Sequence, residues 1–487
     1  MSSYDEVIVN ECPILLGAQA KRNLEPGWKE IKMPKTKIAV QIVSAGHLEG
    51  DAIMLGETYV KQWKIPNGQQ VTLRFGSFRG YVKVIAVSRY DGMRISQSLA
   101  KRLGLHGQTT LRLIYRPAAS QLSIGPLIGV MVSRDYPQTP DKPFGAITQF
   151  CKELVDAGAI QGAHVYFFTP NQLEGSASSL EAWVFADGWR KVKVPAPDVV
   201  NNRLTMRKLE NKPSVQHFLR EVKSRYGTHV FNEKFLDKSE VFDALRKSSA
   251  LVRYLPESHM LQGMPMLKTM CNRYSSVFLK PVRGSLGKGI IKITRLAPGA
   301  YQAHYATSVG TRRQQFPSLP KLYASLAGKM KTVRYQIQQG LHLIEIQGRP
   351  VDFRALVQKN ATGDWSITSI VARIAGGQHF VSNLARGGTL STVKDAVARS
   401  NVAAGARSAA SAKLRRAALD IAAGIDSSIP AHFGELGIDL ALDASGRVWL
   451  LEVNSKPSKN DNTPLTDSNI RPSVRIMLQY ARYLAGF

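Results

Sequence analysis

The chain has 487 residues, 44% of them hydrophobic and 21% charged, and its formal net charge is +29. Two to four globular domains are expected, because the chain is too long for one ordinary hydrophobic core. Neither membrane insertion nor secretion is expected, since no apolar stretch is long enough to cross a bilayer and the N-terminus lacks the pattern of a signal peptide. Three widely separated cysteines, Cys12, Cys151 and Cys271, fit a reducing cytoplasm.

The excess of basic residues predicts a polyanionic partner. Nucleic acid is not the expected partner, because no helix-turn-helix, zinc-finger spacing or aromatic RNA-binding signature accompanies the charge. An acidic substrate or assembly partner remains open, and so does a solvated basic surface that only aids solubility. The basic residues concentrate in two places, at Arg312, Arg313, Lys321, Lys329, Lys331 and Arg334, and at Arg407, Lys413, Arg415 and Arg416.

Residues 1–122 are predicted to form a small β-rich domain that could close into a barrel. Strands are expected where apolar and alternating residues run together, at 37–43, 71–75 and 80–87. A short helix is expected from Ser96 to Leu103, with Gly104 as its stop. Nothing in this region indicates catalysis.

Residues 123–230 are predicted to form an α/β layer. A buried strand, a helix and a second strand follow one another, at 127–132, 146–157 and 165–168.

The third region, 231–487, contains most of the candidate chemistry. It opens with a helix predicted to begin at Asp237, a plausible N-cap with Glu240 three residues later, and to run through Leu251. A long helix is expected over the Ala- and Arg-rich residues 399–425.

A β-hairpin is predicted near the C-terminus, where two apolar runs flank the turn formed by residues 443–446. With this four-residue loop, Leu442 pairs with Arg447 and Asp439 falls opposite Leu450. Side chains alternate between the faces of a strand, so the next polar residues of the second strand share the face that carries Asp439.

The polar residues gathered at this end of the hairpin are Asp439, Glu452 and Asn454. Neighbouring buried carboxylates repel one another unless a cation lies between them. Oxygen ligands without a nearby His or Cys suit Mg²⁺. The alternative is a surface hairpin whose polar side chains face water.

A glycine-rich hairpin is predicted at residues 277–293, where a strand ends in Lys280 and a second strand returns after the glycines. Glycines allow the backbone to approach phosphate oxygens closely. The loop matches neither a Walker A motif nor a dinucleotide-binding motif, since Gly289 is followed by Ile290 and a strand follows in place of a helix. A purely structural turn remains the alternative.

Two arginines, Arg354 and Arg373, lie among strand-forming residues. A guanidinium buried in a sheet requires an anionic partner. A structural pair of Arg354 with Asp352 is one reading, and bidentate binding of phosphate or carboxylate oxygens is the other. Asn383 and Arg386, beside glycines, supply a further amide and guanidinium.

The order of these motifs resembles that of the ATP-grasp ligases, in particular the branch of the ribosomal-protein glutamate ligases. Across nearly the whole chain the sequence looks like the YheC/YheD group of endospore coat-associated proteins. The resemblance implies an ATP-grasp fold of two α+β lobes (231–487). It implies that a Rossmann-like pre-ATP-grasp α/β domain (123–230) and the N-terminal β-rich domain (1–122) precede this fold.

The resemblance also implies a role for each motif. The expected ATP ligands are Lys238 and Lys280 at the phosphates, Gly284, Ser285, Gly287, Lys288 and Gly289 over the phosphates, Gln338 and Gln339 in the segment 336–339 at the adenine, and Glu345 at the ribose. One or two Mg²⁺ ions would be held by Asp439, Glu452 and Asn454. The groups expected to take part in catalysis are Arg354, Arg373, Asn383 and Arg386.

The activity that this resemblance implies is ATP-dependent, ADP-forming ligation of a carboxylate to an amine through an acylphosphate. The basic charge adds the expectation of an acidic peptide or protein substrate. The alternative is a protein of the spore coat that binds ATP and serves in assembly without turnover. The expected location is the cytoplasm, with association to the spore coat implied by the resemblance alone.

Overall fold

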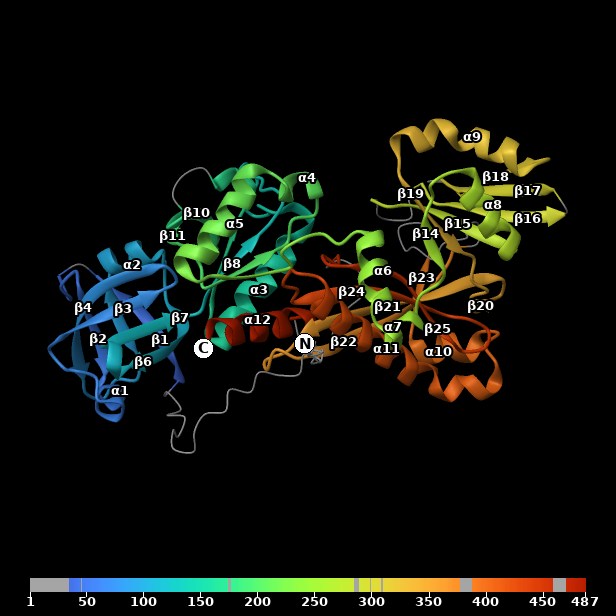
Figure 1. Ribbon diagram of the computed structural model, residues 1–487. Helices are drawn as coiled ribbons and strands as arrows, with labels where there is room; N and C mark the ends of the chain where they lie inside the picture. Colours follow the sequence, from blue (N-terminus) through green and yellow to red (C-terminus); the bar gives the residue numbers. More distant parts are fainter. Residues whose placement is uncertain are drawn as a thin grey trace, which may run out of the picture.

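Four β-sheets organise the described part of the computed structural model (Figure 1). It describes residues 35–44, 46–173, 177–283, 289–297, 299–307, 310–376, 388–458 and 470–487. Figure 1 shows the N-terminal barrel at one end, the third sheet at the other end, and the second and fourth sheets between them. Among the described helices, none combines the length and the apolar character that a membrane span requires.

The first sheet is a closed barrel with the strand order β1-β5-β2-β4-β3-β7-β6. Ser96 caps α2 by accepting a hydrogen bond from the Leu99 N–H at 3.2 Å, and Gly104 ends the helix at φ +70°. The short helix and the three strands expected in this region are therefore confirmed. The elements are β1 (Lys35–Val43), β2 (Ala52–Gly56), α1 (Glu57–Trp63), β3 (Gln70–Phe75), β4 (Phe78–Val87), β5 (Met93–Ser96), α2 (Gln97–Leu103), β6 (Thr109–Arg116) and β7 (Gln121–Gly125).

The second sheet has the order β11-β10-β9-β8-β12-β13, with β9, β8, β12 and β13 parallel. Strand β8 is buried throughout, because α3 packs on one face of the sheet and α5 with the barrel packs on the other. The elements are β8 (Leu127–Met131), α3 (Thr148–Gln161), β9 (His164–Phe168), β10 (Ser179–Phe185), β11 (Trp189–Pro195), β12 (Val199–Asn202), α4 (Arg207–Glu210), α5 (Pro213–Tyr226) and β13 (His229–Phe231).

The last helix of the chain, α12 (Pro472–Ala485), packs beside α3 in the core of this second sheet. Its buried residues include Val474, Met477 and Leu478. The predicted third domain, 231–487, thus ends in a helix that packs on the second sheet and also contacts the fourth sheet. The helix returns to the second domain because its apolar side completes the core above β8 and β9.

The third sheet, with the order β14-β19-β15-β16-β17-β18, forms one lobe of the third region. Helices α8 and α9 cover one of its faces and enclose a separate core. The elements are β14 (Ser258–Met260), α8 (Met264–Arg273), β15 (Ser276–Pro281), β16 (Ile291–Ala297), β17 (Ala300–Ala306), β18 (Thr311–Phe316), α9 (Leu319–Thr332) and β19 (Tyr335–Gln339).

The fourth sheet, with the order β23-β22-β21-β24-β25, forms the other lobe, and β20 pairs with β21 beside this path. Helices α6 and α11 pack in its core, which is the second large apolar cluster of the chain. The elements are α6 (Lys238–Arg246), α7 (Ser249–Val252), β20 (Glu345–Ile346), β21 (Arg349–Lys359), β22 (Trp365–Ile374), β23 (Thr389–Ser391), α10 (Val393–Arg399), α11 (Arg407–Ser428), β24 (Glu435–Leu442) and β25 (Val448–Asn454).

Two helix predictions for this lobe are wrong in their bounds. The helix capped by Asp237 ends at Arg246, where i→i+3 hydrogen bonds tighten its last turn, and α7 is a separate helix. The long helix begins at Arg407, because a 3₁₀ turn at Ala404–Ala406 separates it from α10. The N-cap itself is confirmed, with Asp237 accepting from the Glu240 N–H at 2.8 Å.

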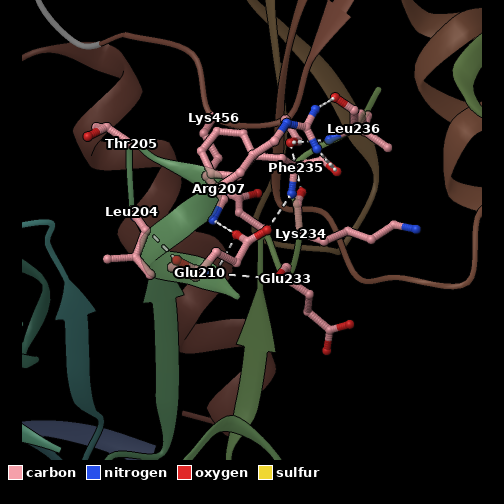
Figure 2. A network of polar contacts seen from close by, with 12 residues as sticks. Leu204, Thr205, Arg207, Glu210, Glu233, Lys234, Phe235, Leu236 and Lys456 are labelled. Carbon is pink, nitrogen blue, oxygen red and sulfur yellow. Dashed lines mark hydrogen bonds and ion pairs between the residues drawn. The ribbon is translucent and has the colours of Figure 1, made fainter. Parts of the chain in front are cut away.

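A buried network of polar contacts, shown in Figure 2, joins the second sheet to the fourth. Its hub is Glu210 at the end of α4. The Glu210 carboxylate accepts hydrogen bonds from Asn202 Nδ2 at 3.2 Å and from the Phe235 N–H at 2.8 Å, and it also pairs with the ammonium of Lys456. Three segments that are far apart in the sequence thus meet at one carboxylate.

The same network aligns the two segments that lead into the candidate site. Ser455 accepts from the Leu236 N–H at 3.2 Å and donates to the Lys234 carbonyl at 2.8 Å. These contacts hold the segment before α6 against the segment after β25. As a result, Lys238 at the start of α6 and Asn454 at the end of β25 are brought to the same place.

We expect Glu210→Gln to lower the free energy of unfolding by about 3–5 kcal/mol, because it leaves the Lys456 ammonium buried without its anion. The two side chains are 4% and 2% exposed, and burial lowers the pKa of Lys456 to about 8 while Glu210 opposes that shift. Urea unfolding followed by tryptophan fluorescence would measure the loss. The double variant Glu210→Gln/Lys456→Met should recover much of it, and equal loss in both proteins would contradict a buried ion pair.

Candidate functional site

The hairpin of β24 and β25 differs in register from the sequence prediction. Leu440 pairs with Leu450, and Asp439 pairs directly with Glu452. The expected pairs, Leu442 with Arg447 and Asp439 with Leu450, are therefore both wrong, and the turn is one residue longer than predicted because Leu442 pairs with Val448. Leu451 is an extra residue in β25 and forms a β-bulge, which the sequence pattern did not reveal.

The bulge explains why the polar side chains still share one face. Residues of β25 before the bulge and Val453 after it belong to the same apolar core, although their spacing breaks the alternation of a regular strand. Glu452 consequently lies on the face of Asp439, and Asn454 lies opposite Gly437 on that face. The three predicted oxygen donors are brought together by this irregularity.

Two arginines surround Asp439 on the neighbouring strands. Arg354 lies directly opposite Asp439 in the sheet and donates Nε and Nη2 to its carboxylate, the latter over 3.1 Å. Arg373 lies opposite Asp352, donates Nε and Nη2 to it over 2.6 and 2.9 Å, and places Nη2 3.2 Å from Asp439 Oδ1. The proposed structural pair of Arg354 with Asp352 is wrong, because each arginine binds the carboxylate across the strands from it.

These contacts keep Asp439 ionised. Burial raises the pKa of Asp439, but the charges of Arg354 and Arg373 and their hydrogen bonds outweigh burial and hold the pKa below its usual value of 3.8. An ionised carboxylate offers about four lone-pair positions. Among the described residues, Arg354 Nε and Arg373 Nη2 share Oδ1 and Arg354 Nη2 takes one position on Oδ2, so Oδ2 keeps a position for a further ligand.

Two lysines from different lobes meet these carboxylates. Lys238 Nζ, at the start of α6, lies 3.2 Å from Glu452 Oε1. Lys280, on β15, donates to the side-chain oxygen of Gln338. Burial lowers the pKa of Lys280 to about 8; the charge of Lys238 adds to this shift, and the charges of Glu452 and Asp439 oppose it. The two lysines and two carboxylates are thus close enough to act on one another.

The donors present suit a hard cation such as Mg²⁺, which takes few protein ligands and keeps others for water and phosphate oxygens. Glu452 is partly exposed and lies opposite Asp439, with Asn454 next on the same face. Within the described part of the chain, no three His, Cys, Asp or Glu side chains gather to hold a metal ion. A metal here would therefore depend on the Asn454 amide and on oxygens of a bound substrate.

Some of the hydrogen-bonding groups in the segment expected at the adenine are already used within the protein. Gln338 lies in β19 between β14 and β15, and its side chain contacts Lys280 and the Ser258 hydroxyl. The Gln339 N–H donates to the Glu257 carbonyl at 2.8 Å. The sheet therefore already uses this N–H, and the binding of adenine by main-chain atoms of residues 336–339 stays a prediction.

Glu345 lies where the two lobes approach each other. Burial lowers the pKa of Lys292 on β16, and the charge of Glu345 opposes that shift, so these two residues of different lobes are close enough for their charges to interact. The backbone of Glu345 forms a reciprocal pair with Asn401, whose Oδ1 accepts from the Glu345 N–H at 2.8 Å. Asn401 is a positioning residue that no local sequence pattern indicated, since it acts through a contact between distant segments.

Six of the predicted site residues lie outside the described residues. Gly289, the last glycine of the loop, is described and takes φ +74°, which favours glycine. The contacts of Gly289 neither support nor oppose a role at a phosphate. The six residues are Gly284, Ser285, Gly287, Lys288, Asn383 and Arg386.

Comparison with known proteins gives a family model and curated relatives. The model of the YheC/D-like ATP-grasp domain matches residues 227–484. The endospore coat-associated protein YheD of Bacillus subtilis (strain 168) is 30% identical over 371 residues, which cover 74% of this chain and 79% of YheD. The endospore coat-associated protein YheC of the same organism is 22% identical over 324 residues, which cover 64% of this chain and 85% of YheC.

Solved structures resemble the chain more distantly. D-alanyl-alanine synthetase A from Vibrio cholerae matches with a TM-score of 0.41 and 13% identity, over 74% of this chain and 98% of that protein.

Proposed function

This chain belongs to the YheC/D-like ATP-grasp family, and on that premise we propose that it is an ATP- and Mg²⁺-dependent, ADP-forming ligase that joins a carboxylate to an amine through an acylphosphate. The observation that supports this most is the meeting of Lys238 and Lys280 with Asp439 and Glu452. These residues come from both lobes, and their charges shift one another's pKa or lie in direct contact.

The residues divide the work of phosphoryl transfer between them. Lys238 and Lys280 would bind phosphate oxygens, which is mainly positioning and charge neutralisation. Arg354 and Arg373, held by Asp439 and Asp352, present rigid guanidinium groups to the transferring group. No nucleophilic side chain is required, because the substrate carboxylate itself accepts the phosphoryl group and the amine then displaces phosphate.

A metal ion held by Glu452, Asn454 and the remaining position on Asp439 would supply charge neutralisation at the phosphates. The protein's own contribution there is to fix the oxygen donors before ATP arrives. The pairing of Asp439 with Glu452 across the bulge sets their separation, and Arg354 holds Asp439 in one orientation.

The substrate class that we favour is an acidic peptide or protein, because the chain carries a net charge of +29. A second candidate is an ATP-binding protein of the spore coat that serves in assembly without turnover. The names of the two Bacillus relatives favour that candidate. In either case we propose a cytoplasmic or spore coat-associated location.

The experiment that separates the two candidates is ADP release from purified protein with MgATP and acidic peptides, each tested with and without an amine donor. Turnover that depends on both the peptide and the amine would support the ligase. Tight binding of ATP with no ADP release for any peptide would support the assembly role. A protein that binds no ATP at all would contradict both.

The pKa of Lys280 predicts how nucleotide affinity varies with pH. Phosphate oxygens bind the charged ammonium, and the pKa of about 8 means that this charge is lost in the free protein above pH 8. Affinity for a non-hydrolysable ATP analogue should therefore be flat below pH 8 and fall above it by up to about tenfold per pH unit.

Isothermal titration calorimetry at about six pH values between about 6.5 and 9.5 would measure this dependence. Lys280→Arg should remove it, because a guanidinium keeps its charge throughout the range. Lys268→Arg, an exposed change on α8 of the same lobe, is the matched control. A flat profile for the unmodified protein would contradict the role of Lys280.

A further inference from the structure

The lobe built on the third sheet carries positive charge without any acidic residue of its own. Residues 258–344 contain no Asp or Glu, and the flanking acids are Glu257 and Glu345. Glu257 is engaged by Arg273 and by the Tyr274 hydroxyl at 2.5 and 2.6 Å. The thirteen basic residues of this range are Lys268, Arg273, Lys280, Arg283, Lys288, Lys292, Arg295, Arg312, Arg313, Lys321, Lys329, Lys331 and Arg334.

Among the described residues, no strand pairs with one edge of this sheet. Strand β18 stands last in the strand order and, within that part of the chain, pairs only with β17, antiparallel and in register over its whole length. Residues 312–315 of β18 are all exposed. An edge strand of this kind presents unpaired N–H and C=O groups to which another extended chain can pair. In Figure 1 the strand lies in the lobe farthest from the barrel.

Cations line the helix-covered side of this edge. Arg312 of β18 lies opposite Tyr305 of β17, and its guanidinium is 4.7 Å from the centre of the Tyr305 ring. The Lys329 ammonium of α9 lies 4.8 Å from the same ring. Tyr305 is buried, so a single fixed aromatic ring holds both cations in place beside the open edge.

On the other face of the sheet, two cations flank a histidine. Lys292, His304 and Arg313 lie directly opposite one another on β16, β17 and β18. The Cβ atoms of directly opposite residues are about 5 Å apart, so a protonated His304 would lie close to both cations. Burial lowers the pKa of His304, and the charges of Lys292 and Arg313 add to this effect. Glu345 already lies near Lys292 at one end of this row, and an anion beside Arg313 at the other end would favour a protonated His304.

We propose that the β18 edge is a docking site for an acidic polypeptide segment, which adds to the sheet as a further extended strand. Its backbone would pair with β18, and its alternate carboxylates would meet Arg312 and Lys329 on one face and Arg313 on the other. The occupant is a peptide rather than a nucleic acid because a strand edge supplies backbone pairing that only a polypeptide can match. This site lies outside the ATP-binding residues and does not depend on ligase turnover.

Fluorescence anisotropy without ATP would test the proposal, with a short labelled peptide of Glu-Glu-Val-Thr repeats and the same peptide with Gln in place of Glu. The acidic peptide should bind and the Gln peptide should not. Arg312→Gln/Arg313→Gln should weaken binding by about tenfold, from two surface ion pairs and their hydrogen bonds. Hydrogen exchange of the amides of residues 311–316 should slow when the acidic peptide binds.

The matched control is Lys394→Gln/Arg415→Gln, which removes two exposed charges from α10 and α11 of the other lobe. Affinity in this control should stay within about twofold. Equal loss in both double variants would overturn the proposal, because net charge alone would then explain binding. Unchanged exchange at β18, or tighter binding of oligodeoxythymidylate of equal charge with the same dependence on Arg312 and Arg313, would also overturn it.

Discussion

Replacing Glu452 by Gln is expected to lower the rate of ADP release by about 10²–10³-fold, with at most a modest loss of stability. The substitution keeps the shape of the side chain but removes the charge that faces Lys238 at 3.2 Å and lies opposite Asp439. Glu452 is partly exposed, but its partner Lys238 is largely buried, so a modest loss of stability is also expected. The loss of activity and of metal dependence should be much larger than that loss of stability explains.

A binding measurement separates this role from a structural one. The unmodified protein should bind a non-hydrolysable ATP analogue more tightly with Mg²⁺ than without it, and Glu452→Gln should lose that gain. Asp364→Asn, an exposed carboxylate in the turn between β21 and β22, is the matched control and should behave as the unmodified protein does. Full activity in Glu452→Gln would remove Glu452 from the proposed site.

Replacing Arg373 by Met is expected to cost about 3–5 kcal/mol of stability. Arg373 is 8% exposed, binds both oxygens of Asp352, and places a third contact on Asp439. Its removal leaves the Asp352 carboxylate buried without these hydrogen bonds, and such a charge is costly. Urea unfolding of the transition that includes this lobe would measure the change.

Acidification gives this prediction a second readout. Arg354 and Arg373 hold the pKa of Asp439 below 3.8 against the effect of burial. A lowered carboxyl pKa contributes stability above its unfolded value and loses that contribution as pH falls through its folded value. The difference in the free energy of unfolding between the unmodified protein and Arg373→Met should therefore be largest at pH 7 and become smaller below about pH 3.8.

Arg373→Lys is the informative control, because it keeps the charge but cannot bind both oxygens of Asp352 in the same fork. The stability that Arg373→Lys loses should lie between zero and the loss in Arg373→Met. A loss as small as that of an exposed substitution in both variants would contradict a buried ion cluster.

Local pattern was enough to predict several elements that build the site. The strand ending in Lys280, the cap at Asp237 and the two strands that carry Asp439 and Glu452 all follow from residue types a few positions apart. Each depends on alternation, capping or turn chemistry within one segment, which is the information that a sequence states directly.

The rest depends on contacts between distant segments. Which carboxylate Arg354 binds is decided by the alignment of β21 with β24, 85 residues later in the chain. The backbone use of Gln339 follows from β14 lying beside β19. The place of α12 follows from the apolar core above β8, which no pattern within α12 could identify.

The β-bulge in β25 also gives Glu452 a role during folding. Without the bulge, the strand would align one step out of phase, placing Leu451 and Val453 beside Asp439 and sending Glu452 and Asn454 into the apolar interior. The cost of burying an unpaired carboxylate there disfavours this misalignment. The Glu452 carboxylate, which we propose to serve the reaction, therefore also favours the correct register of β25. Evolutionary selection for either property constrains the other.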